Sequence, residues 1–515
     1  MVAHIFLVNL KDVELLKTCR LVSKSWNADA TVSLRTWSKV TLMEGNTEFM
    51  KFGALLRRRA SRRVEQLPSP FRNIHADGSA YTDAAFINLL LQPELTITGL
   101  NLDLCEVNRK LDETKLGCVL DANKLTITSL NIYGSLSGDL NESLFANCEF
   151  KFPALRHLQF KDHCQYCACV PIVKNILSLS VPERVTFIIS DGDILISLLP
   201  QEKVDHLKHL TLDIGPISTM AWRHLGKLRF GELRRFCFWP ICITDDEPDH
   251  VEQWHLLCKN VSQSLEDFDF ETDNNFTLST DSELTFPNLQ IIKLWDQNAL
   301  YEFTPRRFPS LSKVICCVSS YLRDLNMTND VVPHRGVQCL QICFGKSSIR
   351  SPDEETWHLL TYLGRQFPNV LLLGIDVPRF CESAMSIIYE AFPKITTLIL
   401  NGSCDFFVLS GTRRPNLFKP VEQIHDRKSI MDFLDLKKIL LGRNFSLEPD
   451  MINLCMAKIP KLKHLEFYWN KSLSASLFQD SVRHLETIII SNSTTDAYRA
   501  DMEQVSKLIP NAVTR

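Results

Sequence analysis

One apolar pattern recurs along almost the whole chain: an apolar residue, two others, a second apolar residue, one other, and a third apolar residue. The pattern often follows a Phe-Pro or Ile-Pro step, and its first apolar residue then falls two positions after the proline. Pro287, Pro309, Pro393 and Pro460 all lead into a match in this register. A register kept in such distant segments indicates repeated structural units, which constrain the fold more than any other sequence feature.

The first apolar residue of each match serves as an anchor for counting the repeats. Fourteen anchors are direct matches: Ile97, Ile127, Leu155, Leu207, Leu233, Leu265, Leu289, Leu311, Val337, Val370, Ile395, Leu436, Leu462 and Leu485. Pro182 occupies the anchor position of a fifteenth match, which divides the long interval between Leu155 and Leu207. A second long interval, after Ile395, is expected to hold an insertion around residues 401–430. The units average about 28 residues, within the range known for short strand–helix repeats.

Each match predicts a short strand, with a helix before the next match. The last two apolar residues alternate with another residue, which places both on one face of a strand because strand side chains alternate sides. Apolar residues at spacings of three and four predict helices at 250–264, 354–367, 382–392 and 496–509. A strand–helix unit cannot bury its apolar face alone, so we expect neighbouring units to stack.

From about residue 90 to the end, the chain resembles the leucine-rich repeat family in this pattern and spacing. The resemblance implies an α/β fold, a solenoid with a curved parallel sheet inside and helices outside. The Asn or Cys that the family places eight residues after the anchor occurs only as Cys105, Asn444 and Asn470. We therefore expect an irregular solenoid. An ordinary α/β protein with coincidental matches is the alternative.

The N-terminal segment carries a different apolar pattern. Leu15, Cys19, Val22 and Trp26 fall at spacings of 4, 3 and 4, which predicts one apolar stripe on a single helix of about four turns. Asp12 can cap that helix at its start. A module this small buries too little surface to be stable by itself, so we expect it to need a partner surface. The simpler interpretation is a terminal cap for the solenoid.

Residues 19–27, CRLVSKSWN, closely resemble the most recognisable part of the F-box, and residues 37–42 resemble the strand that often follows it. The F-box is the helical module by which substrate receptors dock onto the Skp-type adaptor of cullin-RING (SCF) ubiquitin ligases. The Leu-Pro step that usually opens the motif would lie before Met1. The resemblance implies the following adaptor-binding residues: Ile5, Phe6, Leu10, Leu15, Leu16, Cys19, Leu21, Val22 and Trp26.

We therefore expect three regions in the chain. They are an N-terminally truncated F-box at 1–45, a linker or first irregular repeat at 46–90, and a leucine-rich-repeat solenoid of about fifteen units at 91–515. Ile509-Pro510 has the register of a further unit, but the sequence ends at Arg515, so no strand of that unit is expected to form.

Composition argues against several classes of function. The formal net charge of −3 gives no global case for binding nucleic acid or membranes, and no apolar run approaches the roughly 20 residues of a membrane-spanning helix. The N-terminus lacks a signal-peptide pattern, and the 17 cysteines form no disulfide framework. We therefore expect reduced thiols and a cytoplasmic or nuclear location. The basic run at 57–63 is either a nuclear address or a solvated helix face.

No enzyme motif is found in the sequence: it lacks a phosphate loop, a Gly-rich dinucleotide fingerprint, a metalloprotease motif and a nucleophile elbow. We therefore expect no catalytic residue, no cofactor and no metal. Four soft ligands do cluster at His163, Cys164, Cys167 and Cys169. Tetrahedral zinc sites usually combine two pairs from separated segments, so we interpret this cluster as loop and core thiols.

The predicted binding surface follows from the repeat geometry. In each strand, the residues beside the inward pair are expected to point to the concave face, which solenoids use for partners. Tryptophan, tyrosine and arginine are frequent binding hot spots. We predict an exposed acidic centre flanked by aromatic and basic residues, made up of Arg235, Trp239, Asp267, Asp269, Glu271, Trp295 and Tyr468.

The resemblances together favour a non-enzymatic substrate-recognition subunit of an SCF-type ubiquitin ligase. The N-terminal helices would bind the Skp-type adaptor and through it a cullin, and the concave face would hold an unidentified protein substrate. Two alternatives remain open. One is a repeat scaffold that binds partners without ubiquitin transfer. The other is a secreted recognition protein, which the Asn-x-Ser/Thr acceptors at Asn141 and Asn260, among others, would suit.

Overall fold

The computed structural model of the chain forms two compact units, Met1–Val261 (unit 1) and Ser262–Arg515 (unit 2). Each unit is described by itself. The residues that the structure describes are 13–19, 21–37, 39–42, 54, 73–76, 87–88, 90–91, 97–103, 113–134, 151–162, 169–240, 248–271, 283–295, 303–318, 331–344, 354–411, 427–445, 447–469, 473, 484–491 and 512–514.

Unit 1 contains a ladder of parallel strands in which each described strand pairs with the next along the chain. The strands are β1 Lys39–Leu42, β2 Asn73–Ala76, β3 Gly99–Asp103, β4 Ser129–Gly134, β5 His157–Asp162, β6 Arg184–Ile189, β7 His209–Ile214 and β8 Arg235–Pro240. The helices are α2 Val13–Cys19, α3 Lys24–Trp37, α6 Glu113–Asn123, α7 Val170–Leu179, η2 Gly192–Ile194, α8 Leu195–Leu198, α9 Gln201–Val204, α10 Thr219–Lys227 and α11 Pro248–Val261. The ladder thus includes β1 and β2, which precede the predicted start of the solenoid.

Unit 2 continues the same plan with its own parallel ladder. The strands are β9 Asp267–Phe270, β10 Ile291–Leu294, β11 Lys313–Val318, β12 Cys339–Phe344, β13 Leu372–Arg379, β14 Thr397–Ser403, β15 Lys438–Leu441, β16 His464–Tyr468, β17 Thr487–Ser491 and β18 Ala512–Thr514. The helices are α12 Glu354–Gln366, α13 Ala384–Ala391, α14 Phe406–Ser410, η5 Ile430–Asp432, η6 Met451–Cys455 and η7 Met456–Lys458.

The repeat register predicts the strands closely. All fifteen anchors are buried, and in every unit the strand begins two residues after the anchor. A local turn precedes many of the strands: Leu289 N–H donates to the Phe286 carbonyl (3.4 Å), and Leu311 N–H donates to the Phe308 carbonyl (3.2 Å). Proline then occupies the second position of a four-residue turn, which its fixed backbone angle favours.

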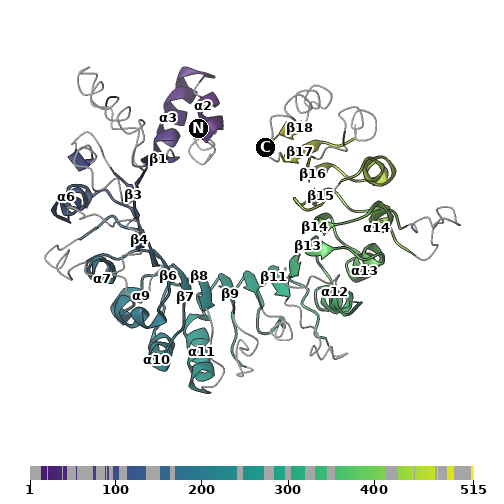
Figure 1. Cartoon of the computed structure of the whole chain (residues 1–515). Coiled ribbons are helices and arrows are strands. Elements are labelled where there is room, and N and C mark those ends of the chain that lie inside the picture. Colours follow the sequence, from purple (N-terminus) through teal and green to yellow (C-terminus); the bar gives the residue numbers. More distant parts are fainter. Residues whose placement is uncertain are drawn as a thin grey trace. The chain divides into compact units, whose positions relative to one another are not determined.

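The alternation of burial along the strands defines the two faces of each sheet. Strands such as β4 and β7 alternate half-buried and buried positions, and the buried side chains form the core between the sheet and the helices. Within each unit, helices α6 to α11 and α12 to α14 lie on one side of their strands (Figure 1). The other side, formed by the second, fourth and sixth residues after each anchor, is here called the open face.

Three of the predicted helices are present as α11, α12 and α13, with ends shifted by a few residues; the segment 496–509 lies outside the described residues. The expectation that no strand follows Ile509-Pro510 is wrong. Pro510 takes the anchor position itself, as Pro182 does, so β18 begins at Ala512 and needs only three residues to pair with β17.

Candidate binding surfaces

The N-terminal helices α2 and α3 pack against each other around a small apolar core. Leu16 and Cys19 of α2 and Ala30 and Leu34 of α3 are buried in it, and Trp26 packs against them half-buried. This core comes from both helices, so the pair forms a helical hairpin and not a continuous rod.

The prediction of one continuous helix through Leu15, Cys19, Val22 and Trp26 is therefore wrong. The chain turns after α2, where the Leu21 N–H donates to the Thr18 carbonyl (3.0 Å). A new helix then starts, because the Ser23 hydroxyl accepts a hydrogen bond from the Trp26 N–H (3.2 Å) in the manner of a helix N-cap. Val22 consequently leaves the buried stripe.

The turn between the helices exposes two apolar side chains. Leu21 is 86% exposed and Val22 is 62% exposed; we call these two residues the apolar turn. Burying an exposed Leu or Val side chain against a partner contributes roughly 1.5–3 kcal/mol to the free energy of binding. Two such side chains next to each other therefore favour binding of an apolar partner surface.

The other residues implied as adaptor contacts fall into two groups. Leu16 and Cys19 belong to the core of the helix pair, and Trp26 packs against it. These three residues therefore stabilise the helix pair that carries the apolar turn. Leu15 lies in α2, although its side chain is outside the description, and Ile5, Phe6 and Leu10 lie outside the described residues. The adaptor contacts themselves remain a prediction.

On the open face of unit 2, a charged and aromatic cluster joins β9 to the end of β10. Asp269 Oδ2 lies 3.1 Å from Lys293 Nζ, and the Trp295 indole N–H donates to Asp269 Oδ1 (3.3 Å). The Lys293 ammonium also lies 4.5 Å from the centre of the Trp295 ring. Register places Asp269 directly opposite Lys293, which explains why these side chains meet.

The prediction of an exposed acidic centre is therefore wrong at Asp269. Its side chain is covered, with the residue 8% exposed, and its charge is offset by Lys293. Asp267 is half-buried and Glu271 is exposed. The sequence contained the reason, since Lys293 and Asp269 both stand four residues after their anchors.

The remaining predicted substrate-binding residues lie on separate parts of the open faces. Arg235 is exposed and Trp239 half-buried at the two ends of β8 in unit 1. Trp295 and Tyr468 are half-buried in unit 2, but strands β11 to β15 separate β10 from β16 in the ladder. The structure thus does not bring Trp295 and Tyr468 together around one acidic centre, and their role in substrate binding remains a prediction.

Two thiols that sequence reasoning did not single out face each other on the same open face. Cys317 of β11 pairs in register with Cys343 of β12, and their side chains form a hydrogen bond. This bond lowers the pKa of Cys343, with Lys293 helping, and raises that of Cys317. The signal was available, because both cysteines stand six residues after their anchors, Leu311 and Val337.

We predict that Cys343 is alkylated by iodoacetamide faster than Cys339 at neutral pH. Both thiols are half-buried on β12, but burial raises the pKa of Cys339 while the Cys317 hydrogen bond lowers that of Cys343. The thiolate is the reactive form, so the lower pKa gives the faster rate. Time-resolved peptide mass spectrometry measures both rates in one sample. The rates should become equal in urea; equal rates in the folded chain would contradict the assignment.

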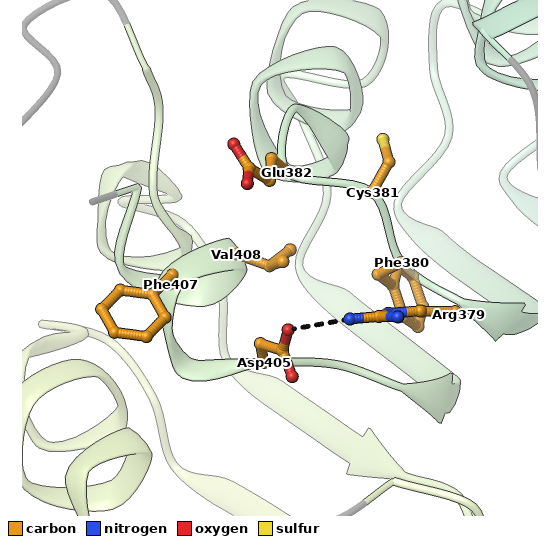
Figure 2. A pocket seen from close by; sticks show the side chains of 7 residues that line it. All are labelled: Arg379, Phe380, Cys381, Glu382, Asp405, Phe407 and Val408. Carbon is orange, nitrogen blue, oxygen red and sulfur yellow. Dashed lines mark hydrogen bonds and ion pairs between the residues drawn. The ribbon is translucent and has the colours of Figure 1, made fainter. Parts of the chain in front are cut away.

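A pocket of about 280 Å³ lies in unit 2 where β13 and β14 end. Its lining residues are Arg379, Phe380, Cys381, Glu382, Asp405, Phe407 and Val408. Figure 2 shows the Arg379 guanidinium directed at Asp405, with Cys381 and Glu382 following Arg379 on the segment after β13. Arg379 Nη2 lies 3.4 Å from Asp405 Oδ2, and Glu382 pairs with Arg427 (3.0 Å). The charged side chains of the lining are thus paired, Arg379 with Asp405 and Glu382 with Arg427 outside the pocket.

Cys169 is buried, and the other three members of the proposed soft-ligand cluster lie outside the described residues. Within the described ranges, no group of three or more His, Cys, Asp or Glu side chains is arranged to hold a metal ion. Among the described helices, none has the length and apolar character that crossing a bilayer requires. The basic run at 57–63 also lies outside the described residues.

The repeated strands, buried anchors and one-sided helices define an α/β leucine-rich-repeat solenoid, as predicted. No protein-family model and no curated protein matches the chain. Similar solved structures are distant. The yeast Rad7 and Elc1 complex is 12% identical, covering 90% of this chain and 94% of that chain, with a TM-score of 0.33.

Two further structures are similar at the same distance. Listeria monocytogenes InlP is 14% identical over 57% of this chain and 64% of that chain, with a TM-score of 0.24. A Bacteroides fragilis protein is 12% identical over 77% of this chain and 76% of that chain, with a TM-score of 0.23. Likenesses this low carry no weight for function, which is therefore inferred from the residues of this chain.

Proposed function

We propose that this chain is a substrate-recognition subunit of an SCF-type ubiquitin ligase, present in the cytoplasm or nucleus. In this proposal the helices α2 and α3 dock onto a Skp-type adaptor and through it onto a cullin. The open faces of the two repeat units hold a target protein. The chain itself performs no catalysis, because the partner ligase transfers the ubiquitin.

The apolar turn is the observation that carries the proposal. Leu21 and Val22 lie within the stretch that resembles the F-box, and both side chains are exposed while the helices around them have a packed core. A cap that only covers the end of a solenoid would turn such side chains inward. Exposed neighbouring apolar residues at a helical turn instead suit a partner protein.

The open faces supply the second half of the proposal. They present half-buried aromatic and charged side chains, including Trp239 in unit 1 and Trp295 and Tyr468 in unit 2. Side chains of this kind anchor many protein–protein contacts. Their presence also favours the second candidate function, a repeat scaffold that binds partners without an adaptor.

Co-elution of the purified full chain with a purified Skp-type adaptor distinguishes the two functions. The receptor proposal predicts a complex of one chain with one adaptor on size-exclusion chromatography, and recruitment of a cullin when it is added. A chain that elutes alone at micromolar concentrations, while an established F-box protein binds the same adaptor sample, would contradict the receptor proposal and leave the scaffold.

A further inference from the structure

Four consecutive strands of unit 1 place basic side chains in one row across the open face. His157, Arg184, His209 and Arg235 are the first residues of β5, β6, β7 and β8. Each is directly opposite the next in the strand register. His157, Arg184 and Arg235 are exposed and His209 is half-buried. We call these four residues the basic row.

The basic row concentrates positive charge within a short span. Neighbouring strands lie about 4.8 Å apart, so the row extends over about 14 Å. Arg156 and Arg234 stand beside it in the chain, and both act electrostatically on the row histidines. Glu183 is a carboxylate that favours protonation of His157, and it is also engaged with Lys208 at 3.5 Å.

The packing that stabilises these strands lies on the other face of the sheet, where Leu158, Val185, Leu210 and Phe236 are buried. The row itself therefore stays on the open face. Its positive surroundings act on the two histidines. Burial first, and then the Arg184 charge, lower the pKa of both His157 and His209. A bound anion would favour protonation of both imidazoles.

We propose that the basic row is a binding site for an extended acidic segment of a partner protein, held through its carboxylate or phosphate groups. Arginine donates paired hydrogen bonds to such oxyanions. The row is as long as about four residues of an extended chain. The next positions along these strands, Gln159, Thr186 and Thr211, are half-buried polar groups that suit a peptide backbone.

The charge distribution favours an acidic peptide over a nucleic acid. Asp213 lies on the same face, four residues beyond His209 on β7, and is half-buried. A nucleic acid carries a phosphate on every nucleotide, so a strand following the sheet would bring phosphates against this carboxylate. The whole chain also has a net charge of −3. A short acidic segment can occupy the row without reaching Asp213.

Fluorescence anisotropy of the full chain with labelled eight-residue peptides tests the proposal. We expect saturable binding of a Glu-rich peptide and of its phosphoserine counterpart, and no binding of the Gln-substituted peptide. Arg184→Gln together with Arg235→Gln should weaken binding about tenfold or more, since two charge-assisted contacts are lost. Lys174→Gln together with Lys227→Gln, the same charge change on helices α7 and α10, should leave the affinity nearly unchanged.

The pH dependence provides a second readout. Because the pKa values of His157 and His209 are lowered in the free chain, both imidazoles are mostly neutral near pH 7. A bound anion favours their protonation, so affinity for the Glu peptide should rise as pH falls from 7.5 to about 5.5, where glutamate stays ionised. The neighbours that oppose or favour this protonation are Arg156, Glu183, Arg184, Arg234 and Arg235.

Several outcomes would overturn the proposal. Equal losses in the two double variants would show a general charge effect and no specific site. Affinity that stays constant or falls as the pH is lowered would show that His157 and His209 do not bind the anion. Tighter binding of a single-stranded RNA, lost in the Arg184→Gln and Arg235→Gln variant, would assign the row to nucleic acid instead. The inference does not rest on adaptor docking. Substitution of Leu21 and Val22 should leave peptide binding unchanged, so the two proposals can fail separately.

Discussion

Replacing both Leu21 and Val22 with aspartate should weaken binding of the Skp-type adaptor about 100-fold or more. Each side chain contributes roughly 1.5–3 kcal/mol when it is buried against a partner, and about 1.4 kcal/mol corresponds to a tenfold change in affinity. Aspartate would in addition place a charge in an apolar contact. Isothermal titration calorimetry with the purified adaptor measures the loss.

The fold should survive these two substitutions, because both side chains are largely exposed in the free chain. Leu125→Asp is the matched control. The Leu125 side chain is likewise largely exposed, at 69%, but it lies between α6 and β4 and not in the apolar turn. It should bind the adaptor like the unaltered chain. Equal losses in the control and the double variant would show that the effect is not specific to the apolar turn. Trp26→Ala is a weaker test, since it removes a side chain that packs against the helix core.

Replacing Trp254 with alanine should destabilise unit 1 by about 3–5 kcal/mol, the cost of truncating a large buried aromatic side chain. Trp254 of α11 is fully buried and stacks on Phe238 of β8, with ring centres 5.5 Å apart. Phe238 also contacts Trp222 of α10, so the change leaves a cavity among three packed elements. Urea unfolding followed by far-ultraviolet circular dichroism measures the shift.

Leu256→Ala provides the control for this prediction on the same helix. Leu256 is 39% exposed, so its truncation removes less buried surface and should cost about 1 kcal/mol or less. A similar shift of the unfolding midpoint in both variants would mean that α11 does not pack on the sheet as described. An undisturbed midpoint for Trp254→Ala would contradict the position of the helix altogether.

The strand positions could be predicted from sequence because a local turn determines them. In many repeats the anchor N–H donates a hydrogen bond to the carbonyl of the residue three positions earlier, as Leu462 does to Ile459, so the strand start follows from a few adjacent residues. Pro182 and Pro510 show that proline can itself hold the anchor position. The prediction missed β18 because it required an apolar residue after the proline.

The N-terminal helix break was harder to predict because spacings of 4, 3 and 4 are compatible with a continuous helix. The competing signal was Ser23, whose hydroxyl caps α3. A capping residue in the middle of an apolar stripe indicated a new helix start, and this signal outweighed the periodicity. The continuous-helix prediction placed Val22 on a buried stripe, whereas its side chain is exposed and forms part of the proposed binding surface.

Contacts across the sheet were the least predictable part of the candidate surfaces. Asp269 meets Lys293, and Cys317 meets Cys343, across more than 20 residues of sequence. Such pairs become visible only when the anchors of neighbouring repeats are aligned and the same offset is compared. The basic row has the same origin, because its four members all stand two residues after an anchor.

Hydrogen–deuterium exchange of the full chain, with and without an excess of the purified Skp-type adaptor, tests the receptor proposal most directly. Amide exchange slows where backbone becomes protected by a partner. We predict slower exchange in peptides covering residues 18–27, and unchanged exchange in peptides covering 113–134. Unchanged exchange over residues 18–27, or protection confined to the strands, would contradict docking through the apolar turn.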